Sequence, residues 1–435
     1  MHPQQLRIFV SPLNFFFFSI SWLISGGNKV YISFNTFIQP INKKINRYYQ
    51  QLYQPMSSKL KLLQKLGIEY PIFLSPMAGV STIELIAAIT NNGGLGSIPL
   101  ASIDFRQDDG VPKLDKLIEE YSRVVKKQKN IVNLNFFCHE IESTPTTEQI
   151  QNWKKLYSKV LNIKEEILNQ AKFTNGNVSF KEVETNYEAQ YNRLLKYLEN
   201  LKPKVASFHF GIPSQETIQR LQKIGTMVFV SSTSLEETKK LVECGVDGII
   251  LQGYEAGGHR GNFLISKTFD ENLSTQALFI QLKKYIDTLD QQNVPFLVPA
   301  GGIVDSETIN YYLEQGSDAV QLGTAFLATP ESTNSKFFTT AKTKDRSNTI
   351  MIDLVSGKQA RTVRTEFIDG LINKNGYPLN ELPGYGYMYN AYKSLKPLVN
   401  GQDIGFYLAG QNYHQIETNK LAEEIMQKLI NGLNK

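Results

Sequence analysis

Residues 226–253 read TMVFVSSTSLEETKKLVECGVDGIILQG and form one complete predicted strand–helix–strand unit. Its two ends, 226–232 and 248–253, are short apolar runs, typical of parallel strands buried on both faces. Between them, Ser234 and Glu237 stand three residues apart, which predicts a helix that begins with a capping box. Two parallel strands joined by such a helix indicate an α/β fold.

The same unit recurs along most of the chain. Eight short apolar runs alternate with amphipathic stretches, and eight such units predict closure into a (β/α)8 barrel, the TIM-barrel fold. The predicted strands are 72–77, 95–101, 131–137, 205–211, 226–232, 248–253, 295–302 and 319–327. Helices are predicted at 82–93, 214–225, 234–245 and 306–316.

Two regions lie outside this repeat. Residues 141–199 are polar and predict helices inserted after the third strand, and residues 335–435 are rich in tyrosine and predict a terminal helix at 421–433. We therefore expect three parts: an N-terminal extension (1–55), a barrel with its insertion (56–334) and a C-terminal region (335–435).

The N-terminal 55 residues differ in kind from the rest. Residues 8–24, IFVSPLNFFFFSISWLI, are apolar but contain Pro12, and their length is marginal for a membrane span. Three interpretations remain open: an organelle-targeting segment, a secretory signal, or an extension ahead of a functional start near Met56. We expect a barrel without membrane insertion, in the cytoplasm, or in mitochondria if residues 1–55 are a targeting segment.

Charge and composition exclude some partners. Hydrophobic residues make up 41% of the chain, enough for a sizeable core. Residues 1–55 hold five basic and no acidic residues; removing these five from the 46 basic residues leaves 41, equal to the 41 acidic residues. The body is neutral, so we expect no nucleic-acid partner. Cys138 and Cys244 exclude a disulfide framework, and the five histidines show no metal-ligand spacing.

In a parallel barrel the active site lies at the C-terminal ends of the strands. The first strand ends in a rigid turn at 75–79, made by Pro76 and Gly79, and the third carries two amides, Asn133 and Asn135, on one face. The sixth is followed by 252–261, QGYEAGGHRG, whose glycines let backbone N–H groups approach a ligand. Each segment alone is equally compatible with an ordinary turn.

The loops after strands seven and eight are the frequent phosphate site of this fold. They carry Gly301-Gly302 and Gly323-Thr324, and together they predict a phosphate-bearing cofactor. Other phosphate motifs fail: no G-x-x-x-x-G-K-[ST] occurs, and the glycines at 93–96 precede a strand instead of following one.

Two histidines fall at predicted strand ends. His209 shares a strand face with Ser207 and Gly211, where a neutral imidazole suits a general base, although a core histidine bonded to a carbonyl fits equally. His259 lies in the glycine-rich loop, where cofactor contact and catalysis are both compatible with its position. Spacing alone does not show which of the two histidines is the catalytic one.

Five segments, in this order, resemble the successive motifs of the class I nitronate monooxygenases of fungi and bacteria, formerly called 2-nitropropane dioxygenases. They are PIFLSPMAGVST (71–82), SFHFG (207–211), LQGYEAGGHRG (251–261), PAGGI (299–303) and QLGTAF (321–326). The resemblance covers about residues 68–330. It implies a non-covalently bound FMN and the oxidation of alkyl nitronates, and of nitroalkanes, by O2 to carbonyl compounds and nitrite.

The resemblance also assigns residues. It implies that His209 is the base that takes the α-proton of a neutral nitroalkane. A Tyr-x3-Tyr-x3-Lys arrangement near the family's pocket matches Tyr385, Tyr389 and Lys393, which would share one face of a helix, or belong to a packed tail. The implied flavin contacts are Pro76, Met77, Ala78, Asn135, Gln252, Gly257, Gly258, His259, Gly301, Gly302, Gln321, Gly323 and Thr324.

There are three alternatives, of which the second fails and the other two stay open. The first is an FMN-dependent enoyl-thioester reductase that uses NAD(P)H. The second is an IMP-dehydrogenase-like barrel, which needs a cysteine in the loop after strand six, where this chain has none. The third is a non-catalytic barrel that binds a phosphate-bearing ligand.

Overall fold

The computed structural model describes residues 57–264, 269–290, 294–343, 348–399 and 401–434. The predictions for residues 1–55 therefore lie outside the described residues. Among the described helices, none combines the length and the apolar character that crossing a membrane requires.

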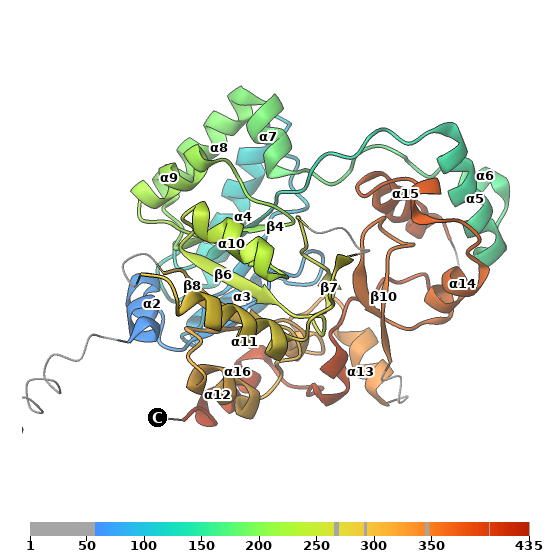
Figure 1. The fold of residues 1–435 in the computed structure, drawn as a ribbon. Helices are drawn as coiled ribbons and strands as arrows, with labels where there is room; N and C mark the ends of the chain where they lie inside the picture. The colour runs from blue at the N-terminus through green and yellow to red at the C-terminus, as the bar shows by residue number, and fades with distance from the viewer. Residues whose placement is uncertain (1–56, 265–268, 291–293, 344–347, 400, 435) are drawn as a thin grey trace, which may run out of the picture. The chain divides into compact units, whose positions relative to one another are not determined.

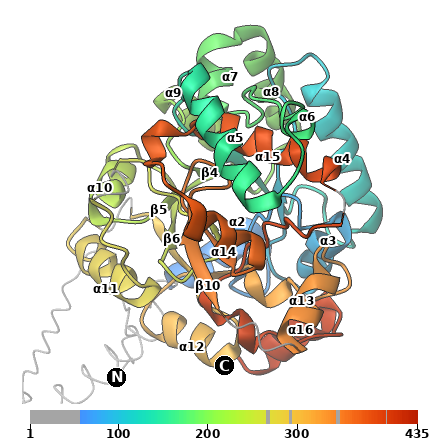
Figure 2. The same ribbon diagram turned by 90° about the vertical axis from the view of Figure 1, so that its right-hand side faces the viewer.

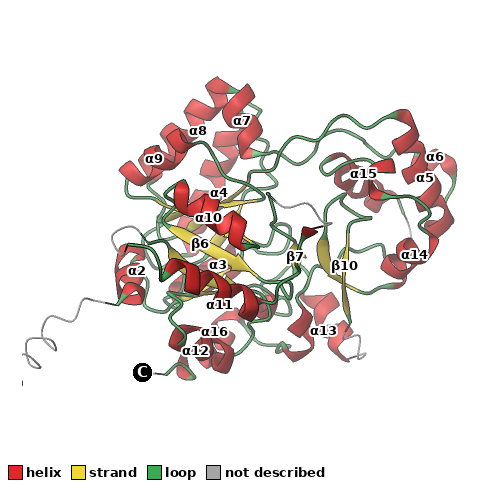
Figure 3. Ribbon diagram, viewed as in Figure 1, coloured by secondary structure: helices red, strands yellow, loops and turns green. Residues whose placement is uncertain are grey.

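Eight parallel strands form the barrel in the order β1-β9-β8-β6-β5-β4-β3-β2 (Figures 1 and 3). A parallel bridge between Phe73 and Leu95 closes it, with Leu95 N donating to the carbonyl of Ile72 at 2.9 Å. The predicted (β/α)8 barrel is confirmed, and each strand lies within its predicted range. The strands are β1 (Ile72–Leu74), β2 (Ser97–Pro99), β3 (Asn133–Phe137), β4 (Val205–His209), β5 (Met227–Ser232), β6 (Gly248–Gln252), β8 (Phe296–Ala300) and β9 (Val320–Leu322).

One helix follows each strand, so the barrel has its full set of eight units. These helices are α3 (Ile83–Asn91), α4 (Gly110–Val124), α8 (Glu188–Leu201), α9 (Gln215–Lys223), α10 (Leu235–Glu243), α11 (Thr275–Ile286), α12 (Ser306–Glu314) and α16 (Ala422–Asn431). The five helices predicted from the sequence are all present. The eighth, α16, comes 100 residues after β9 in the chain, yet its Met426 and Leu429 are buried in the core shared by strands and helices.

The barrel interior is a separate apolar cluster. Alternate residues of the strands, such as Phe229 on β5 and Val298 on β8, pack there with Leu62 and Leu66 of α2 (Ser58–Leu66). The Ser57 side chain accepts a hydrogen bond from Leu60 N and thereby caps this helix. One end of the barrel is filled in this way, which leaves the ends of the strands with the long loops for a site.

Two long additions interrupt the βα order. The first holds α5 (Thr147–Leu161), α6 (Glu165–Leu168) and α7 (Phe180–Asn186) between β3 and α8. The second lies between β9 and α16. It comprises α13 (Ser335–Thr343), β10 (Thr349–Ile352), β11 (Ala360–Val363), α14 (Glu366–Lys374) and α15 (Tyr387–Leu395), besides short 3-10 turns.

The two additions share a second hydrophobic core. Trp153 and Tyr157 of α5 are fully buried against Phe367 and Ile368 of α14, and α15 adds Tyr392. Figures 1 and 2 both show α5, α6, α14 and α15 side by side. Since both additions arise from loops at the C-terminal ends of strands, this core lies on the side of the barrel where catalytic groups are expected.

Candidate active site

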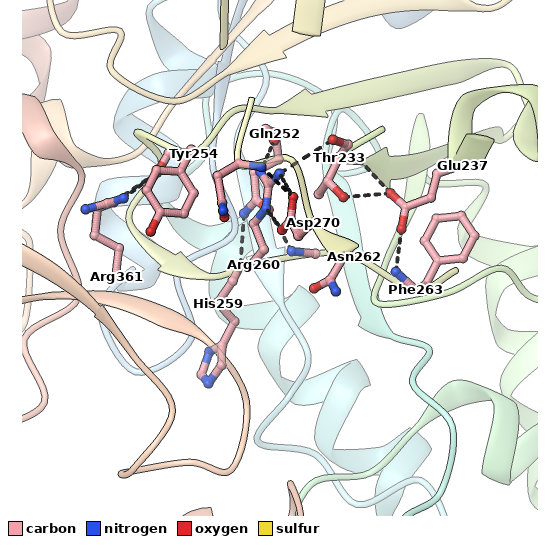
Figure 4. A network of polar contacts seen from close by, with 12 residues as sticks. Thr233, Glu237, Gln252, Tyr254, His259, Arg260, Asn262, Phe263, Asp270 and Arg361 are labelled. Carbon is pink, nitrogen blue, oxygen red and sulfur yellow. Dashed lines mark hydrogen bonds and ion pairs between the residues drawn. The ribbon is translucent and has the colours of Figure 1, made fainter. Parts of the chain in front are cut away.

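The glycine-rich loop after β6 is held by two buried arginines (Figure 4). Arg260 forms an ion pair with Asp270 (Nε to Oδ2, 2.7 Å) and donates to the carbonyl of Gln252 at 2.6 Å. Arg361, on β11, donates to the carbonyl of Tyr254 at 2.8 Å. The short strand β7 (Gly258–His259) also pairs with β11. The backbone of the loop is therefore fixed from both sides.

The predicted capping box at Ser234 and Glu237 forms only in part. Ser234 Oγ accepts a hydrogen bond from Glu237 N at 3.2 Å. The buried carboxylate of Glu237 accepts instead from the backbone N–H groups of Thr233 (2.7 Å), Phe263 (2.5 Å) and Leu264 (3.2 Å). Burial raises the pKa of this carboxyl group. The second half of the capping-box prediction is wrong, because this side chain ties the start of α10 to the loop after β6.

The glycines in the loops after β8 and β9 stand where a side chain would be strained or crowded. Gly301 and Gly302 adopt φ angles of +121° and +71°, which favour glycine, and a Cβ on Gly301 would lie 2.8 Å from Thr275 Oγ1. A Cβ on Gly323 would lie 3.1 Å from the Cβ of Ser75. Both loops thus present backbone without side-chain cover, as a phosphate site requires.

A C-terminal segment that the sequence analysis did not single out packs against the loops after β8 and β9. Gly410 N donates to Thr324 Oγ1 at 3.0 Å, and Asn412 Nδ2 donates to the carbonyl of Gly302 at 2.7 Å. A Cβ on Gly257 would lie 2.6 Å from Gly410 N. The Ala-Gly pair at 409–410 was the only sequence signal here.

Two of the three amides predicted to contact a cofactor, Asn135 and Gln252, already hold protein partners. Asn135 Nδ2 donates to Ser207 Oγ at 2.9 Å. Gln252 Nε2 donates to the carbonyl of His259 at 2.9 Å, while its Oε1 accepts from Gly261 N at 2.7 Å. These bonds fix the orientation of both amides at the mouth of the barrel.

The remaining predicted cofactor residues lie at the same end of the barrel. Residues 76–78 follow β1, and a Cβ on Gly323 would approach Met77 Sδ to 3.3 Å. Gln321 lies on β9, in register with Phe73 and Ala300 of the neighbouring strands. The other amide of β3, Asn133, donates to Ser97 Oγ at 3.0 Å.

His209 ends β4, and its imidazole is held through both ring nitrogens. Nδ1 lies 2.8 Å from Ser231 Oγ, and Nε2 lies 3.2 Å from the carbonyl oxygen of His259. Because a carbonyl only accepts, we assign the hydrogen to Nε2 and the lone pair to Nδ1. Burial and then the charge of Lys358 lower the pKa of His209 to about 4, and the bond to His259 offsets this only in part. The imidazole is therefore neutral at pH 7.

The imidazole of His259 points away from the arginine network of its loop (Figure 4). Its Nε2 lies 2.9 Å from Ser356 Oγ. The ring makes edge contacts with Tyr385 and Tyr389 (centroids 5.6 and 5.7 Å apart) and with Phe210 (5.9 Å). Burial first, and then the neighbouring His209, Lys358 and Lys393, lower its pKa to about 3. The backbone of His259 thus belongs to the loop, whereas its side chain belongs to an aromatic cluster.

The structure brings the three residues of the Tyr-x3-Tyr-x3-Lys arrangement to this cluster. Only Tyr389 and Lys393 lie on α15, because the helix begins at Tyr387 and Tyr385 precedes it. Lys393 Nζ lies 4.7 Å from the centroid of the Tyr389 ring and donates to Asn177 Oδ1 at 3.0 Å. The helical face predicted for all three residues therefore holds for two of them.

Several residues of this cluster were missed in the sequence analysis: Ser231, His139, Asn177 and Lys358. The polar atoms of His139 and Tyr385 are buried beside Asn177, and the two rings lie 5.0 Å apart. Buried polar atoms of this kind suit a ligand. Within the described part of the chain, no group of three or more His, Cys, Asp or Glu side chains is placed to hold a metal ion.

Comparisons with known proteins agree with this architecture. The family model described as nitronate monooxygenase matches residues 59–432. A Saccharomyces cerevisiae protein whose name places it among the nitronate monooxygenases is 44% identical over 365 residues, which cover 81% of this chain and 88% of the yeast chain. A similarly named protein of Staphylococcus aureus (strain Newman) is 29% identical over 386 residues, with 87% and 98% covered.

Two solved structures are similar in fold. Nitroalkane oxidase from Streptomyces ansochromogenes has a TM-score of 0.70 and 25% identity, over 86% of this chain and 97% of its own. FabK from Thermotoga maritima has a TM-score of 0.58 and 22% identity, over 86% and 95%. The second likeness concerns the fold alone.

Proposed function

Since the chain belongs to the nitronate monooxygenase family, a family of flavin-dependent oxidoreductases, we propose that its cofactor is FMN and that His209 is its catalytic base. The reaction is the oxidation of alkyl nitronates, and of the parent nitroalkanes, by O2 to carbonyl compounds and nitrite. One observation supports the base most directly: a neutral imidazole stands at the end of β4, beside an aromatic cluster flanked by two lysines.

The residues present fit FMN. Gly301, Gly302, Gly323 and Thr324 would hold its phosphate, since a Cβ would clash at Gly301 and be crowded at Gly323. Residues 76–78, Asn135, Gln252 and 257–259 would line the ring system at the strand ends. When bound, FMN supplies the electron acceptor that delivers the reducing equivalents to O2.

His209 would move the proton of a neutral nitroalkane. The α-carbon of such a substrate releases its proton to Nδ1, the ring atom that carries the lone pair, and the electron pair of the C–H bond passes into the nitro group. In the substrate-free site the Ser231 hydroxyl, 2.8 Å away, donates to this lone pair. It would turn away for the transfer and then accept a hydrogen bond from the new N–H. A nitronate already lacks this proton, so His209 would only orient it.

The C-terminal region would complete the substrate pocket. Tyr385 and Tyr389 offer an aromatic wall for a short aliphatic chain, and Lys393 offers a positive charge beside it. The partners are accordingly a small nitro compound and O2. We place the protein in the cytoplasm, or in mitochondria if residues 1–55 direct import.

Oxygen consumption by the purified yellow holoprotein tests the reaction. We expect rapid oxygen uptake with propyl-1-nitronate, together with release of nitrite, and FMN in the supernatant after denaturation. An enoyl-thioester reductase would show the opposite pattern, in which NADPH bleaches the flavin quickly and the nitronate has no effect.

A further inference from the structure

A second lysine reaches the aromatic cluster from the turn between β10 and β11. Lys358 Nζ lies 4.8 Å from the centroid of the Phe210 ring and 3.4 Å from the carbonyl oxygen of Asn262. Phe210 directly follows His209, and their rings lie 4.3 Å apart. The side chain of Lys358 is thus partly buried beside the proposed base.

Lys358 forms no ion pair with a carboxylate among the described residues. Two acids exert an electrostatic influence on it, Glu142 and Glu237. Glu142 is exposed, and the carboxylate of Glu237 is already engaged by backbone N–H groups. The buried Arg260, in contrast, is paired with Asp270. An unpaired cation in a partly buried site is costly, so it is usually retained for a ligand.

The other groups that face this lysine are basic or aromatic. Its charge contributes to the lowered pKa of His139, His209 and His259. Burial lowers the pKa of Lys358 itself, and a negative group at this place would favour its ammonium form. Positive charge therefore lies next to His209, and among the described residues no carboxylate forms an ion pair with Lys358.

We propose that Lys358 is a substrate-binding residue, which holds the nitro group and stabilises the negative charge that gathers on its oxygens as His209 takes the α-proton. In this step the C–H bond breaks, its electron pair forms the C=N bond of the nitronate, and the proton passes to Nδ1 of His209. No oxidant takes part. The proposal rests on the proposed function and names the residue that recognises the reacting group.

Lys393 holds a different position. It donates to Asn177 and lies over Tyr389, and its charge contributes to the lowered pKa of His259, whereas Lys358 contributes to the lowered pKa of both His259 and His209. The side chain is also more exposed than that of Lys358. Lys358 is therefore the lysine next to the reacting atoms, and Lys393 serves as the matched comparison.

Nitrate binding to the holoprotein tests the proposal apart from turnover, because nitrate is planar and anionic like the nitro end of a nitronate. Binding is followed through the absorbance of the bound flavin. We expect Lys358→Met to raise the Kd for nitrate and the KM for propyl-1-nitronate by about 10- to 100-fold, the usual effect of losing a charge-assisted bond. Lys358→Arg should restore most of both.

The pH profile separates this role from a structural one. With 1-nitropropane, Lys358→Met should move the acid limb of kcat/KM to higher pH, since a positive neighbour of His209 is lost, whereas Lys393→Met should leave that limb in place. If Lys358→Met yields no folded holoprotein, Lys358→Gln replaces it, because its amide still donates to Asn262.

Wild-type affinity for nitrate in Lys358→Met or Lys358→Gln, or no binding of nitrate to the wild type, would overturn the proposal for Lys358. A wild-type holoprotein that binds nitrate but consumes no oxygen with a nitronate would overturn the proposed function instead. The two failures are therefore distinguishable.

Discussion

The Nε2 atom of His209 lies 3.2 Å from the backbone carbonyl oxygen of His259. This contact joins the end of β4 to the glycine-rich loop after β6, and it fixes which ring nitrogen of His209 carries hydrogen. The same carbonyl accepts from Gln252 Nε2 at 2.9 Å. One carbonyl oxygen thus positions both the proposed base and a proposed cofactor residue.

The protonation of His209 predicts a pH profile. Its pKa of about 4 lies below the ordinary 6.5, so the base stays neutral down to about pH 5 and is lost as the pH falls through 4. The kcat/KM for 1-nitropropane should be level from pH 7 to 5 and fall about tenfold per pH unit below 4. Steady-state rates in overlapping buffers check this, and an acid limb near 6.5 would contradict the buried, neutral imidazole.

Ser231 should act through His209. Ser231→Ala removes the hydroxyl 2.8 Å from Nδ1, so the imidazole loses its fixed orientation. We expect kcat/KM for 1-nitropropane to fall about tenfold, the scale of one lost hydrogen bond, while propyl-1-nitronate is little affected. Ser231→Thr keeps the hydroxyl and is the control. Equal losses on both substrates would indicate a structural role.

The ion pair of Arg260 and Asp270 should stabilise the fold. Their side chains are 1% and 4% exposed, and Asp270→Asn leaves Arg260 as a buried charge without its partner. We expect the free energy of unfolding to fall by about 3 kcal/mol. Urea denaturation measures it, with Lys113→Ala as the control, because the exposed pair Lys113–Asp109 should contribute about 0.5 kcal/mol or less. Similar losses in both variants would refute this ranking.

A substitution at Gly301 should weaken FMN binding more than it lowers the stability of the fold. Gly301→Ala places a Cβ 2.8 Å from Thr275 Oγ1 at a positive φ, within the proposed phosphate loop. Gly225→Ala is the matched control, because Gly225 also has a positive φ (+84°) but has no heavy atom within 4 Å of the added Cβ. We expect FMN affinity to fall at least about tenfold only in Gly301→Ala, as for a lost phosphate contact. Unchanged FMN titrations of both apoproteins would place the phosphate elsewhere.

The barrel was predictable because its signals are local. Each strand is a short apolar run, and helices such as α3 and α9 begin at a capping Thr82 or Ser214 that the sequence displays directly. The packing of α5 against α14 was not predictable, since the two helices lie some 200 residues apart and each shows only an amphipathic pattern.

The residues of the site also fall into those that the sequence could predict and those that it could not. The glycines of the phosphate loops and His209 stand at strand ends, where the fold itself indicates their place. Ser231 also stands at a strand end, that of β5, so its place could have been predicted in the same way. Asn177 and Lys358, in contrast, reach the cluster through tertiary contacts with α15 and the loop after β7. No periodicity or spacing in the sequence encodes such contacts, so these residues emerge only from the folded chain.

The most direct test of His209 as the base compares His209→Ala on two substrates of the holoprotein. We predict that kcat/KM falls about 100- to 10,000-fold for neutral 1-nitropropane, the usual contribution of a general base, and less than about tenfold for propyl-1-nitronate. The flavin content should stay that of the wild type. Equal losses on the two substrates, or full activity on 1-nitropropane, would contradict the account.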